Sequence, residues 1–468
     1  MSGDFRSRPL DRRTAVSILA ASLIAGCGDS GSDDADSAVD AAPAARTDVP
    51  LRILLVGNAS VAEAIRLAWS MTHEHPLEIE VFDPADPAVA GAALAGDDIT
   101  AGESPAVRFT RQMLLSDVAI TPQSYLGEIN AKDAAVRFGS ELLKEYQAEY
   151  GKPLPAVINS LGDYGGSTWG VAVGAKVLAR LAIDSQSQCE TWSEYHDWVR
   201  GLEGKAAEPL APGWAASSFL NRCASTFTRR WLFNRTTMKP EIDSEDYVAV
   251  LEQLAATAGL YASSAMTPGQ IWQAIAGGEL VGGIGYEVPA SASETAADEA
   301  SADQPPEERE EFDISVFDCP RQTETDQLWL GPQTPLACLS SGCRQTNASK
   351  QFIGWLSGGQ RISTVRQQSE LFSQTRISPE NESMQSGSAY ARWLVERLQT
   401  LQVAPGLVLP GADRYYEVLD RQVRRCLAAE QSAAEALSDA ASQWDAITDS
   451  IGRDQQSVAW KRTLGFGG

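Results

Sequence analysis

The sequence has little positive charge and no long hydrophobic run. Among 468 residues, 38 Lys and Arg stand against 62 Asp and Glu, a formal net charge of -24. Such a surplus of negative charge repels phosphate backbones, so the composition argues against nucleic-acid binding. No apolar stretch reaches the roughly 20 residues that a membrane-spanning helix needs. We therefore expect neither a nucleic-acid partner nor a membrane-spanning segment.

Signatures of catalysis are also missing. The sequence contains no GxSxG nucleophile elbow, no GxxxxGK[ST] phosphate loop and no HExxH metal helix. Of three histidines, His73 and His75 fall in a polar stretch between a predicted helix and strand, as is typical of a solvated loop. No pair of carboxylates stands out as a glycosidase dyad. We expect no enzyme, no metal and no cofactor.

The N-terminus has the features of an export signal. Arginines precede an apolar run at 15–25, which is too short to span a bilayer and is typical of a signal-peptide core. Residues 23–27 (LIAGC) resemble the lipobox of bacterial lipoproteins, which implies a signal peptide over residues 1–27 and lipid attached to Cys27. The Arg12-Arg13 pair resembles a twin-arginine signal, but Thr14-Ala15 follows where hydrophobic residues are expected. Sec and Tat export both stay open.

The next segment predicts a tether and then a folded domain. Residues 28–48 consist almost wholly of Gly, Ser, Asp and Ala and other small or polar residues, a composition typical of a flexible linker. Residues 51–57 (LRILLVG) predict a buried strand, and Ser60 is a candidate cap for the helix that follows. Residues 77–82 alternate as a strand does, and 117–120 predict another strand. This strand–helix–strand order predicts an α/β sheet with mostly parallel strands.

Later helices carry clear start signals. Thr191 and Glu194 form a capping box, as do Ser432 and Glu435, and Thr267-Pro268 opens a third helix. By contrast, residues 289–312 consist of small, acidic and proline residues and predict an acidic loop inserted between two strands.

Cysteine usage leaves two alternatives. Six cysteines follow the lipid-attachment site, namely Cys189, Cys223, Cys319, Cys338, Cys343 and Cys426. An even number in an exported protein is compatible with up to three disulfides, and Cys338 and Cys343 are close enough in sequence to staple one loop. Buried free thiols are the alternative.

The tryptophans divide into two groups. Five fall on apolar helix faces and predict core packing: Trp69, Trp192, Trp272, Trp355 and Trp444. Three others, Trp169, Trp214 and Trp329, lie near Gly or Pro at predicted strand ends or loops. A flat aromatic face in such a place can stack on the C–H face of a sugar ring. The alternative is a hydrophobic side chain that covers a loop.

Several stretches resemble one family, the extracellular solute-binding proteins of bacterial ABC importers (family 1, sugar-binding, with maltose-binding protein). The similar stretches are residues 51–56 with the following helix, 169–174 (WGVAVG), 191–195 (TWSEY), 231–244 and 270–286. Departures occur near the family's cleft, where Gly282-Gly283 replaces the usual Ala-Met and Tyr286-Glu287 stands where Trp-Pro is common.

The resemblance implies an α/β, two-lobed periplasmic-binding-protein fold (type II) with lobes joined by crossover strands. The solute-binding domain would span 49–468, with lobe 1 at about 49–173 and 326–380 and lobe 2 at about 174–325 and 381–468. The function implied is a monomeric, lipid-anchored receptor facing the periplasm or extracellular space, which delivers a small solute, expected to be a saccharide, to ABC permease subunits. The alternative is a cell-surface structural or signalling protein that keeps the fold without transport.

The resemblance also implies where ligand binds. Mapped onto this sequence, the family's cleft positions are Asn58, Gln123, Tyr125, Trp169, Trp214, Tyr286 and Glu287. Trp169, Trp214 and Tyr286 would offer stacking faces. Asn58, Gln123 and Glu287 would exchange hydrogen bonds with hydroxyl groups. The alternative for Trp169 and Trp214 is that both only pack the interface between the lobes.

Overall fold

The computed structural model describes residues 48–85, 103–183, 189–226, 231–289, 312–321, 327–358, 362–370, 372–377 and 387–465. The predicted lipoprotein signal peptide with Cys27, the tether up to residue 47 and the acidic segment from 290 to 311 lie outside these residues. All described residues belong to one unit, Ala45–Gly468. Within this part of the chain, every helix is too short or too polar to span a bilayer.

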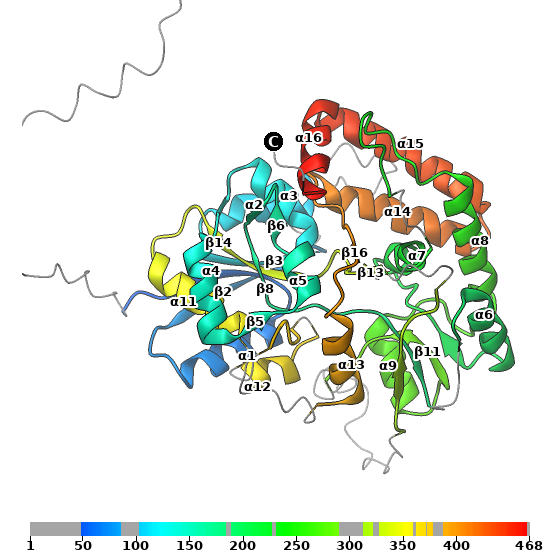
Figure 1. The fold of residues 1–468 in the computed structure, drawn as a ribbon, viewed down its shortest axis with the longest axis horizontal. Helices are drawn as coiled ribbons and strands as arrows, with labels where there is room; N and C mark the ends of the chain where they lie inside the picture. Colours follow the sequence, from blue (N-terminus) through cyan, green and yellow to red (C-terminus); the bar gives the residue numbers. More distant parts are fainter. Residues whose placement is uncertain are drawn as a thin grey trace, which may run out of the picture. The chain divides into compact units, whose positions relative to one another are not determined.

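The larger sheet contains six strands and is mixed in direction (Figure 1). In order across the sheet they are β2 (Leu77–Phe82), β1 (Leu51–Val56), β3 (Val118–Pro122), β14 (Pro335–Ser340) and β4 (Ala135–Val136), with β8 (Val171–Ala172) also paired to β14. Strand β1 runs parallel to β2 and β3, whereas β14 runs antiparallel to β3, β4 and β8. Parallel neighbours need a crossover, and a helix supplies it between β1 and β2.

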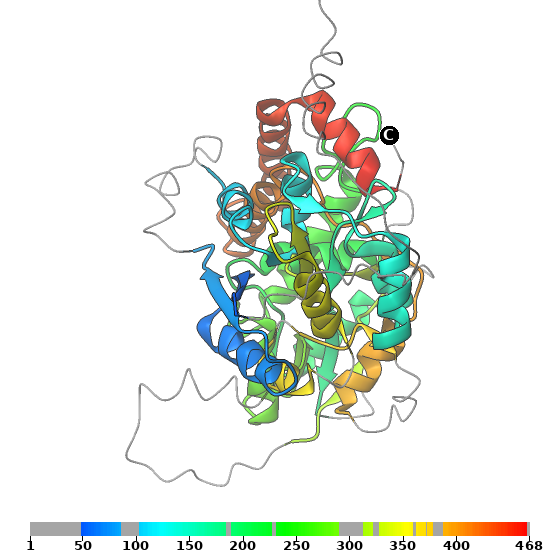
Figure 2. The ribbon, with the colours of Figure 1, turned by 90° about the vertical axis from the view of Figure 1, so that its left-hand side faces the viewer.

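Helices pack on both faces of this sheet, because alternate residues of a strand point to opposite sides (Figures 1 and 2). Ile53 and Leu55 of β1 pack in one hydrophobic core with Trp69 and Trp355, whereas Leu54 packs in the other. The helices that follow or precede its strands are α1 (Ala59–Ser70), α2 (Pro105–Met113), α3 (Leu126–Ala131), α4 (Ser140–Tyr150), α5 (Pro155–Ser160), α11 (Thr346–Ser357) and α12 (Ser363–Gln367), with a short 3-10 turn, η2 (Gln123–Tyr125).

The smaller sheet has four strands in the order β10 (Ala206–Ala207), β11 (Gly282–Gly285), β9 (Ala179–Ala182) and β12 (Ser315–Phe317). Strands β11 and β12 flank β9 and both run antiparallel to it, so the acidic segment connects two strands of this sheet. Its helices are α6 (Trp192–Gly201), α7 (Ala215–Ala224), α8 (Glu245–Ala258) and α9 (Pro268–Ala276).

The chain passes between the two sheets more than once, and the connecting stretches are called crossover segments. Residues 173–178 lead from β8 of the larger sheet to β9 of the smaller one, and the chain returns from β12 to β14 by way of β13 (Leu328–Trp329). Three two-stranded pairs complete the sheets: β13 with β16 (Val403–Ala404), β5 (Lys152–Pro153) with β15 (Arg376–Ile377), and β6 (Asp163–Tyr164) with β7 (Ser167–Thr168).

Four helices follow at the C-terminal end, α13 (Ala389–Arg397), α14 (Ala412–Leu427), α15 (Ala433–Ile451) and α16 (Arg453–Thr463). Helix α14 contacts both α7, which follows β10 of the smaller sheet, and η2, which follows β3 of the larger sheet. Its Asp413 carboxylate accepts a hydrogen bond of 3.0 Å from the Ala106 backbone N–H, at the start of α2. Whether the lobes divide at the boundaries expected from the sequence stays a prediction.

Most of the predicted elements are confirmed, with two corrections. The expected arrangement of mostly parallel strands is wrong, because β14 runs antiparallel to its three neighbours in the larger sheet and β9 runs antiparallel to β11 and β12 in the smaller one. The second correction concerns the start of α1. The strands at 51–56 and 77–82 and all three predicted capping boxes or helix starts are present. Ser60, however, is not the cap of α1. The helix begins at Ala59, because the Asn58 side chain accepts a hydrogen bond of 3.0 Å from the Val61 backbone N–H and so takes the cap position.

The six cysteines are free thiols. Cys338 and Cys343 are not joined to each other. Cys338 is buried in β14, and the Cys343 sulfur lies 3.2 Å from the Ser349 hydroxyl. Burial raises the pKa of Cys319 and Cys338 to about 12, so both stay protonated at neutral pH.

Candidate ligand-binding site

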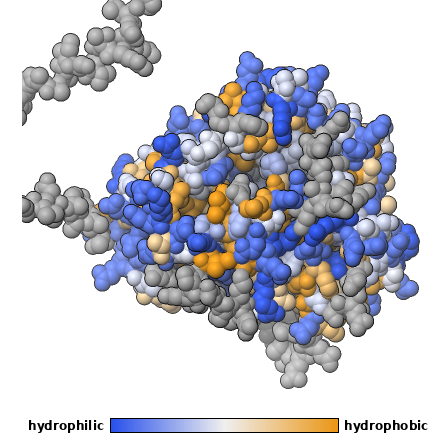
Figure 3. All heavy atoms as spheres, viewed as in Figure 1, coloured by the Kyte–Doolittle hydropathy of each residue, from blue (hydrophilic) through white to orange (hydrophobic). Residues whose placement is uncertain are grey.

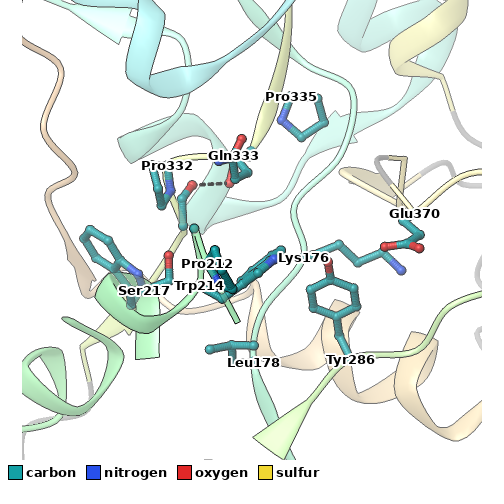
Figure 4. A pocket seen from close by; sticks show the side chains of 14 residues that line it. Lys176, Leu178, Pro212, Trp214, Ser217, Tyr286, Pro332, Gln333, Pro335 and Glu370 are labelled. Atoms are coloured by element: carbon teal, nitrogen blue, oxygen red, sulfur yellow. Dashed lines mark hydrogen bonds between the residues drawn. The ribbon is translucent and has the colours of Figure 1, made fainter. Parts of the chain in front are cut away.

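A cavity of about 300 Å³ lies where the crossover segments meet (Figure 4). Its volume falls at the lower end of the range of small-molecule sites, about 300–1,000 Å³. The lining comes from five separate parts of the chain: Lys176, Leu178, Pro212, Gly213, Trp214, Ser217, Tyr286, Trp329, Gly331, Pro332, Gln333, Thr334, Pro335 and Glu370.

Aromatic rings and prolines provide the apolar part of the lining. The rings of Trp214 and Tyr286 meet edge to face, with centroids 5.9 Å apart and planes at 64°. Trp329 is buried, and its indole N–H has no hydrogen-bond acceptor among the described residues. Rings of this kind offer flat surfaces for the C–H groups of a sugar or polyol.

The first turn of α7 is held in place by a carboxylate of α14. Asp420 accepts hydrogen bonds from the backbone N–H groups of Gly213, at 3.0 Å, and Ala216, at 3.2 Å. Gly213 has φ of 86°, a left-handed conformation that a residue without Cβ adopts without strain. These contacts satisfy N–H groups at the start of the helix and place Trp214 and Ser217 at the cavity.

Farther along α7 a buried ion pair ties the helix to the smaller sheet. Arg222 donates two hydrogen bonds to Glu208, at 3.1 and 2.6 Å, and the two side chains are 0% and 1% exposed. The Tyr261 hydroxyl lies 3.1 Å from the same carboxylate, and the guanidinium lies 4.1 Å from the centre of the Trp192 ring. Burial by itself lowers the pKa of Arg222, but the attraction of Glu208 outweighs it and leaves that pKa raised.

Lys176, on the crossover from β8 to β9, brings a positive charge to the cavity. Its ammonium donates one hydrogen bond of 2.7 Å to the Glu287 carbonyl oxygen and lies 5.3 Å from the centre of the Tyr286 ring. It forms no ion pair with a carboxylate of the described residues. Burial lowers the pKa of Lys176 to about 8, and the attraction of Glu287 and Glu370 opposes that shift without reversing it.

Two side chains from later in the sequence fix the backbone around Lys176. The Tyr390 hydroxyl donates to the Val177 carbonyl oxygen at 2.7 Å and accepts from the Val177 N–H at 3.2 Å. The Ser373 hydroxyl accepts from the Ala175 N–H at 2.7 Å. The backbone that carries Lys176 is therefore held on both sides of the residue.

Glu370 brings a negative charge to the same side of the cavity as Lys176 and Tyr286 (Figure 4). Its carboxylate accepts no hydrogen bond from the described residues. Both carboxylate oxygens lie close to Gly269 in the first turn of α9, at 3.5 and 3.6 Å from the point where a Cβ would stand. Desolvation raises the pKa of Glu370, and the charge of Lys176 opposes that shift.

Of the residues expected to bind ligand, only Trp214 and Tyr286 line this cavity. Asn58 is exposed and caps α1. Gln123 is buried, and its amide donates a hydrogen bond of 2.6 Å to the Ser160 carbonyl oxygen. Tyr125 is buried against Phe109, and burial raises its pKa.

The two remaining predicted residues lie outside the cavity lining. Trp169 is half-buried, and its indole N–H donates to the Tyr164 carbonyl oxygen at 3.1 Å. The Glu287 carboxylate accepts a hydrogen bond from the Ser388 hydroxyl. Its backbone, however, supplies the acceptor for Lys176, which makes Glu287 a neighbour of the site.

Sequence reasoning missed Lys176, Ser217 and Glu370, as well as the loop from Gly331 to Pro335. One signal was available for Lys176, because it stands as a single charged residue in the apolar run from 171 to 179. Ser217 and Glu370 carry no such signal. No group of three or more metal-binding side chains occurs in the part of the chain that the structure describes.

The fold matches that of a known group of solved structures. The chain has the two-lobed α/β fold of ABC transporter solute-binding proteins, which confirms the fold expected from the resemblance. A solute-binding protein from Agrobacterium radiobacter, in complex with ribitol, superposes with a TM-score of 0.64 and 13% identity. One from Agrobacterium vitis, with bound D-mannitol, gives 0.61 and 14%, and the GacH receptor of Streptomyces glaucescens, studied unliganded and with acarbose, gives 0.59 and 12%.

Each alignment covers 86% of this chain and 99% of the other, so the similarity extends over the whole fold. At these identities it establishes the fold alone. No protein-family model matches the sequence, and no curated protein is similar to it in sequence.

Proposed function

We propose that this protein is an extracytoplasmic solute-binding receptor that captures a sugar or polyol and delivers it to an ABC importer. The observation that carries the proposal is the cavity between the crossover segments, with three aromatic rings beside isolated polar groups. A flat apolar wall with a few directed hydrogen-bonding groups suits a ligand that has C–H faces and hydroxyl rims. The ligands of the similar structures, ribitol, D-mannitol and acarbose, have this character.

Capture in this fold requires that both sheets contribute to one site and that the units carrying them close on the ligand. The lining meets the first requirement, because Trp214 and Tyr286 follow elements of the smaller sheet, whereas Thr334 and Pro335 lead into β14 of the larger one. Figure 3 shows mostly hydrophilic side chains on one face, with hydrophobic ones gathered near its centre.

A thermal-shift screen of the purified protein against hexoses, pentoses, disaccharides and polyols tests the proposal. A ligand at a hundredfold excess over its Kd stabilises the native state by about 2.7 kcal/mol, which gives a clear rise in Tm. Calorimetry then measures the Kd, and deletion of the gene is expected to abolish uptake of that ligand. No stabilisation by any compound, together with unchanged uptake, would contradict the proposal and favour a role without transport.

We also propose that the receptor is held at the membrane by lipid on Cys27. A single acyl chain binds a membrane only marginally, whereas several chains anchor a protein stably. Replacing Cys27 by Ser removes the attachment point, so the C27S protein is expected in the soluble exported fraction. If this variant stayed with the membrane after a salt wash, the anchor would be elsewhere.

A further inference from the structure

We infer that Lys176 and Glu370 together hold neighbouring hydroxyl groups of an uncharged ligand, so that the site selects neutral sugars or polyols against their acidic counterparts. The inference rests on the proposed function and deepens it by assigning the residues that set ligand charge. It starts from the hydrogen-bonding capacity that the two side chains leave unused.

The ammonium of Lys176 has three N–H donors, and one of them is used by the Glu287 carbonyl oxygen. The carboxylate of Glu370 receives no hydrogen bond from the described residues, although it offers four acceptor positions. Both side chains line the cavity and lie on the same side of it (Figure 4). A donor group and an acceptor group therefore face one space without being joined to each other.

A hydroxyl group fits this arrangement, because its oxygen accepts from the ammonium while its hydrogen is donated to a carboxylate. Two adjacent hydroxyls satisfy both side chains without bringing in a charge. Hydrogen bonds to charged groups are about twice as strong as those between neutral groups, so the pair contributes much of the binding energy.

The charges nearby disfavour acidic ligands. One ammonium, Lys176, faces two carboxylates, Glu370 in the cavity and Glu287 next to it, and Tyr286 and Tyr390 beside the ammonium are uncharged at neutral pH. An acidic sugar would add a third negative charge, and this addition opposes binding in a partly desolvated site.

The aromatic wall fixes the orientation of the bound molecule. Tyr286 lies under the ammonium, at 5.3 Å from ring centre to Nζ, and also meets Trp214 edge to face. A ligand with its C–H face against Trp214 therefore turns its hydroxyl rim toward Lys176 and Glu370. The rings select the shape of the ligand, and the charged side chains select against added negative charge.

Calorimetry with matched ligands tests this inference. The sets are D-glucose with D-glucuronate, D-galactose with D-galacturonate, and D-mannitol with D-mannonate. For the wild-type protein, in whichever set binds, the neutral member is expected to bind at least tenfold more tightly than its acidic counterpart. K176M and E370Q are each expected to weaken the neutral ligand by about tenfold or more. In E370Q the acidic counterpart is expected to gain at least tenfold relative to the neutral one.

Control variants remove the same charges elsewhere. Lys144 and Glu141 form an exposed pair on α4, so K144M and E141Q change the net charge as K176M and E370Q do, without touching the cavity. Their ligand affinities should equal those of the wild type, and circular dichroism and thermal melts check that each variant is folded.

The outcomes separate the two proposals. If the acidic counterpart binds the wild type as tightly as the neutral ligand, or if K176M and E370Q leave the neutral affinity within twofold, the inference is wrong while the receptor function stands. If no compound of any charge binds the wild type, the proposed function is wrong and the inference falls with it.

Discussion

Two pairs of oppositely charged side chains lie in this part of the molecule, and the contrast between them separates fold from function. Arg222 of α7 and Glu208 are joined by two hydrogen bonds and are almost wholly buried. Lys176 and Glu370 line the cavity and form no ion pair with each other. In the first pair, called the filled pair, the two charges are joined directly, although Nη1 of Arg222 has no acceptor among the described residues. In the second, called the open pair, the two charges are not joined.

The difference follows from the cost of removing charge from water. A buried charge destabilises a protein unless partners of opposite charge and hydrogen bonds compensate it. Arg222 has that compensation, and its pKa stays raised despite burial. Lys176 lacks it, and burial lowers its pKa to about 8. An incompletely compensated charge at a cavity is typical of a functional site, because a ligand can supply the missing partner.

The largest expected effect is on the filled pair. Replacing Glu208 by Gln leaves the Arg222 guanidinium buried without its counter-charge, and we expect the free energy of unfolding to fall by about 3–5 kcal/mol. Urea unfolding followed by circular dichroism measures the loss. The exposed carboxylate of Glu141 is the control, and E141Q is expected to change stability by less than about 1 kcal/mol. A loss of similar size in both variants would mean that burial of the pair contributes little.

In the open pair, replacing Lys176 is expected to raise the free energy of unfolding rather than lower it, by an amount that depends on pH. The folded pKa of Lys176, about 8, lies below its ordinary value of 10.5, so the unfolded chain binds the proton more tightly. Its unfavourable contribution is complete below pH 8 and disappears as pH rises through 10.5. Relative to wild type, K176M should therefore lose a stability advantage of about 3 kcal/mol between pH 7 and pH 11.

The difference between the two unfolding free energies is the quantity to measure, because the titration of the tyrosines then cancels. A difference that does not change with pH would show that Lys176 is fully compensated in the free protein, as Arg222 is. That result would remove the contrast between the two pairs.

Trp214 sharpens the comparison on the apolar side of the cavity. It is half-buried, so W214A removes a face that ligand would contact as well as some packing against Tyr286. We expect the affinity for the identified ligand to fall by about 1 kcal/mol or more while the protein stays folded. Calorimetry beside a denaturant melt distinguishes the roles. Unchanged affinity with a loss of about 3–5 kcal/mol in stability would make Trp214 a packing residue only.

The smallest expected effect concerns Asn58. Its side-chain oxygen accepts a hydrogen bond from the Val61 N–H, so, like Glu208 with Arg222, it already has a partner within the protein. N58A is expected to lose about 1 kcal/mol of stability through loss of the helix cap. N58S keeps a capping oxygen and should recover most of that loss. A fall in ligand affinity in both variants would instead return Asn58 to the binding site.

Local patterns predicted much of the fold, because their causes are local. The alternation in residues 77–82 and the apolar run at 51–56 each specify a strand through burial of alternate or successive side chains. The capping boxes at Thr191 and Ser432 predicted helix starts for the same reason, since each satisfies backbone N–H groups within four residues. Ser60 failed because Asn58, two residues earlier, competes for the same role.

The candidate site was predictable only in part. Trp214 and Tyr286 came from the resemblance, and both line the cavity. Gln123 and Tyr125 are buried outside the cavity lining, where the Gln123 amide donates to the Ser160 carbonyl oxygen and the Tyr125 ring packs against Phe109. Pattern alone does not tell a polar side chain that binds ligand from one that bonds to a distant carbonyl group.

By itself the sequence determined the net negative charge, most strands and helix starts, and a resemblance that specified the fold, whereas the export signal stays a prediction. Those properties depend on composition and on neighbours within a few residues. Only the tertiary structure decided which charges face the cavity, because Lys176, Ser217 and Glu370 are far apart along the chain. Contacts from Tyr390, Ser373 and Asp420 hold the elements that carry Lys176 and Ser217 in place. Whether a hydrogen-bonding group is left open for ligand depends on every side chain packed around it, and packing is settled only when the whole chain has folded.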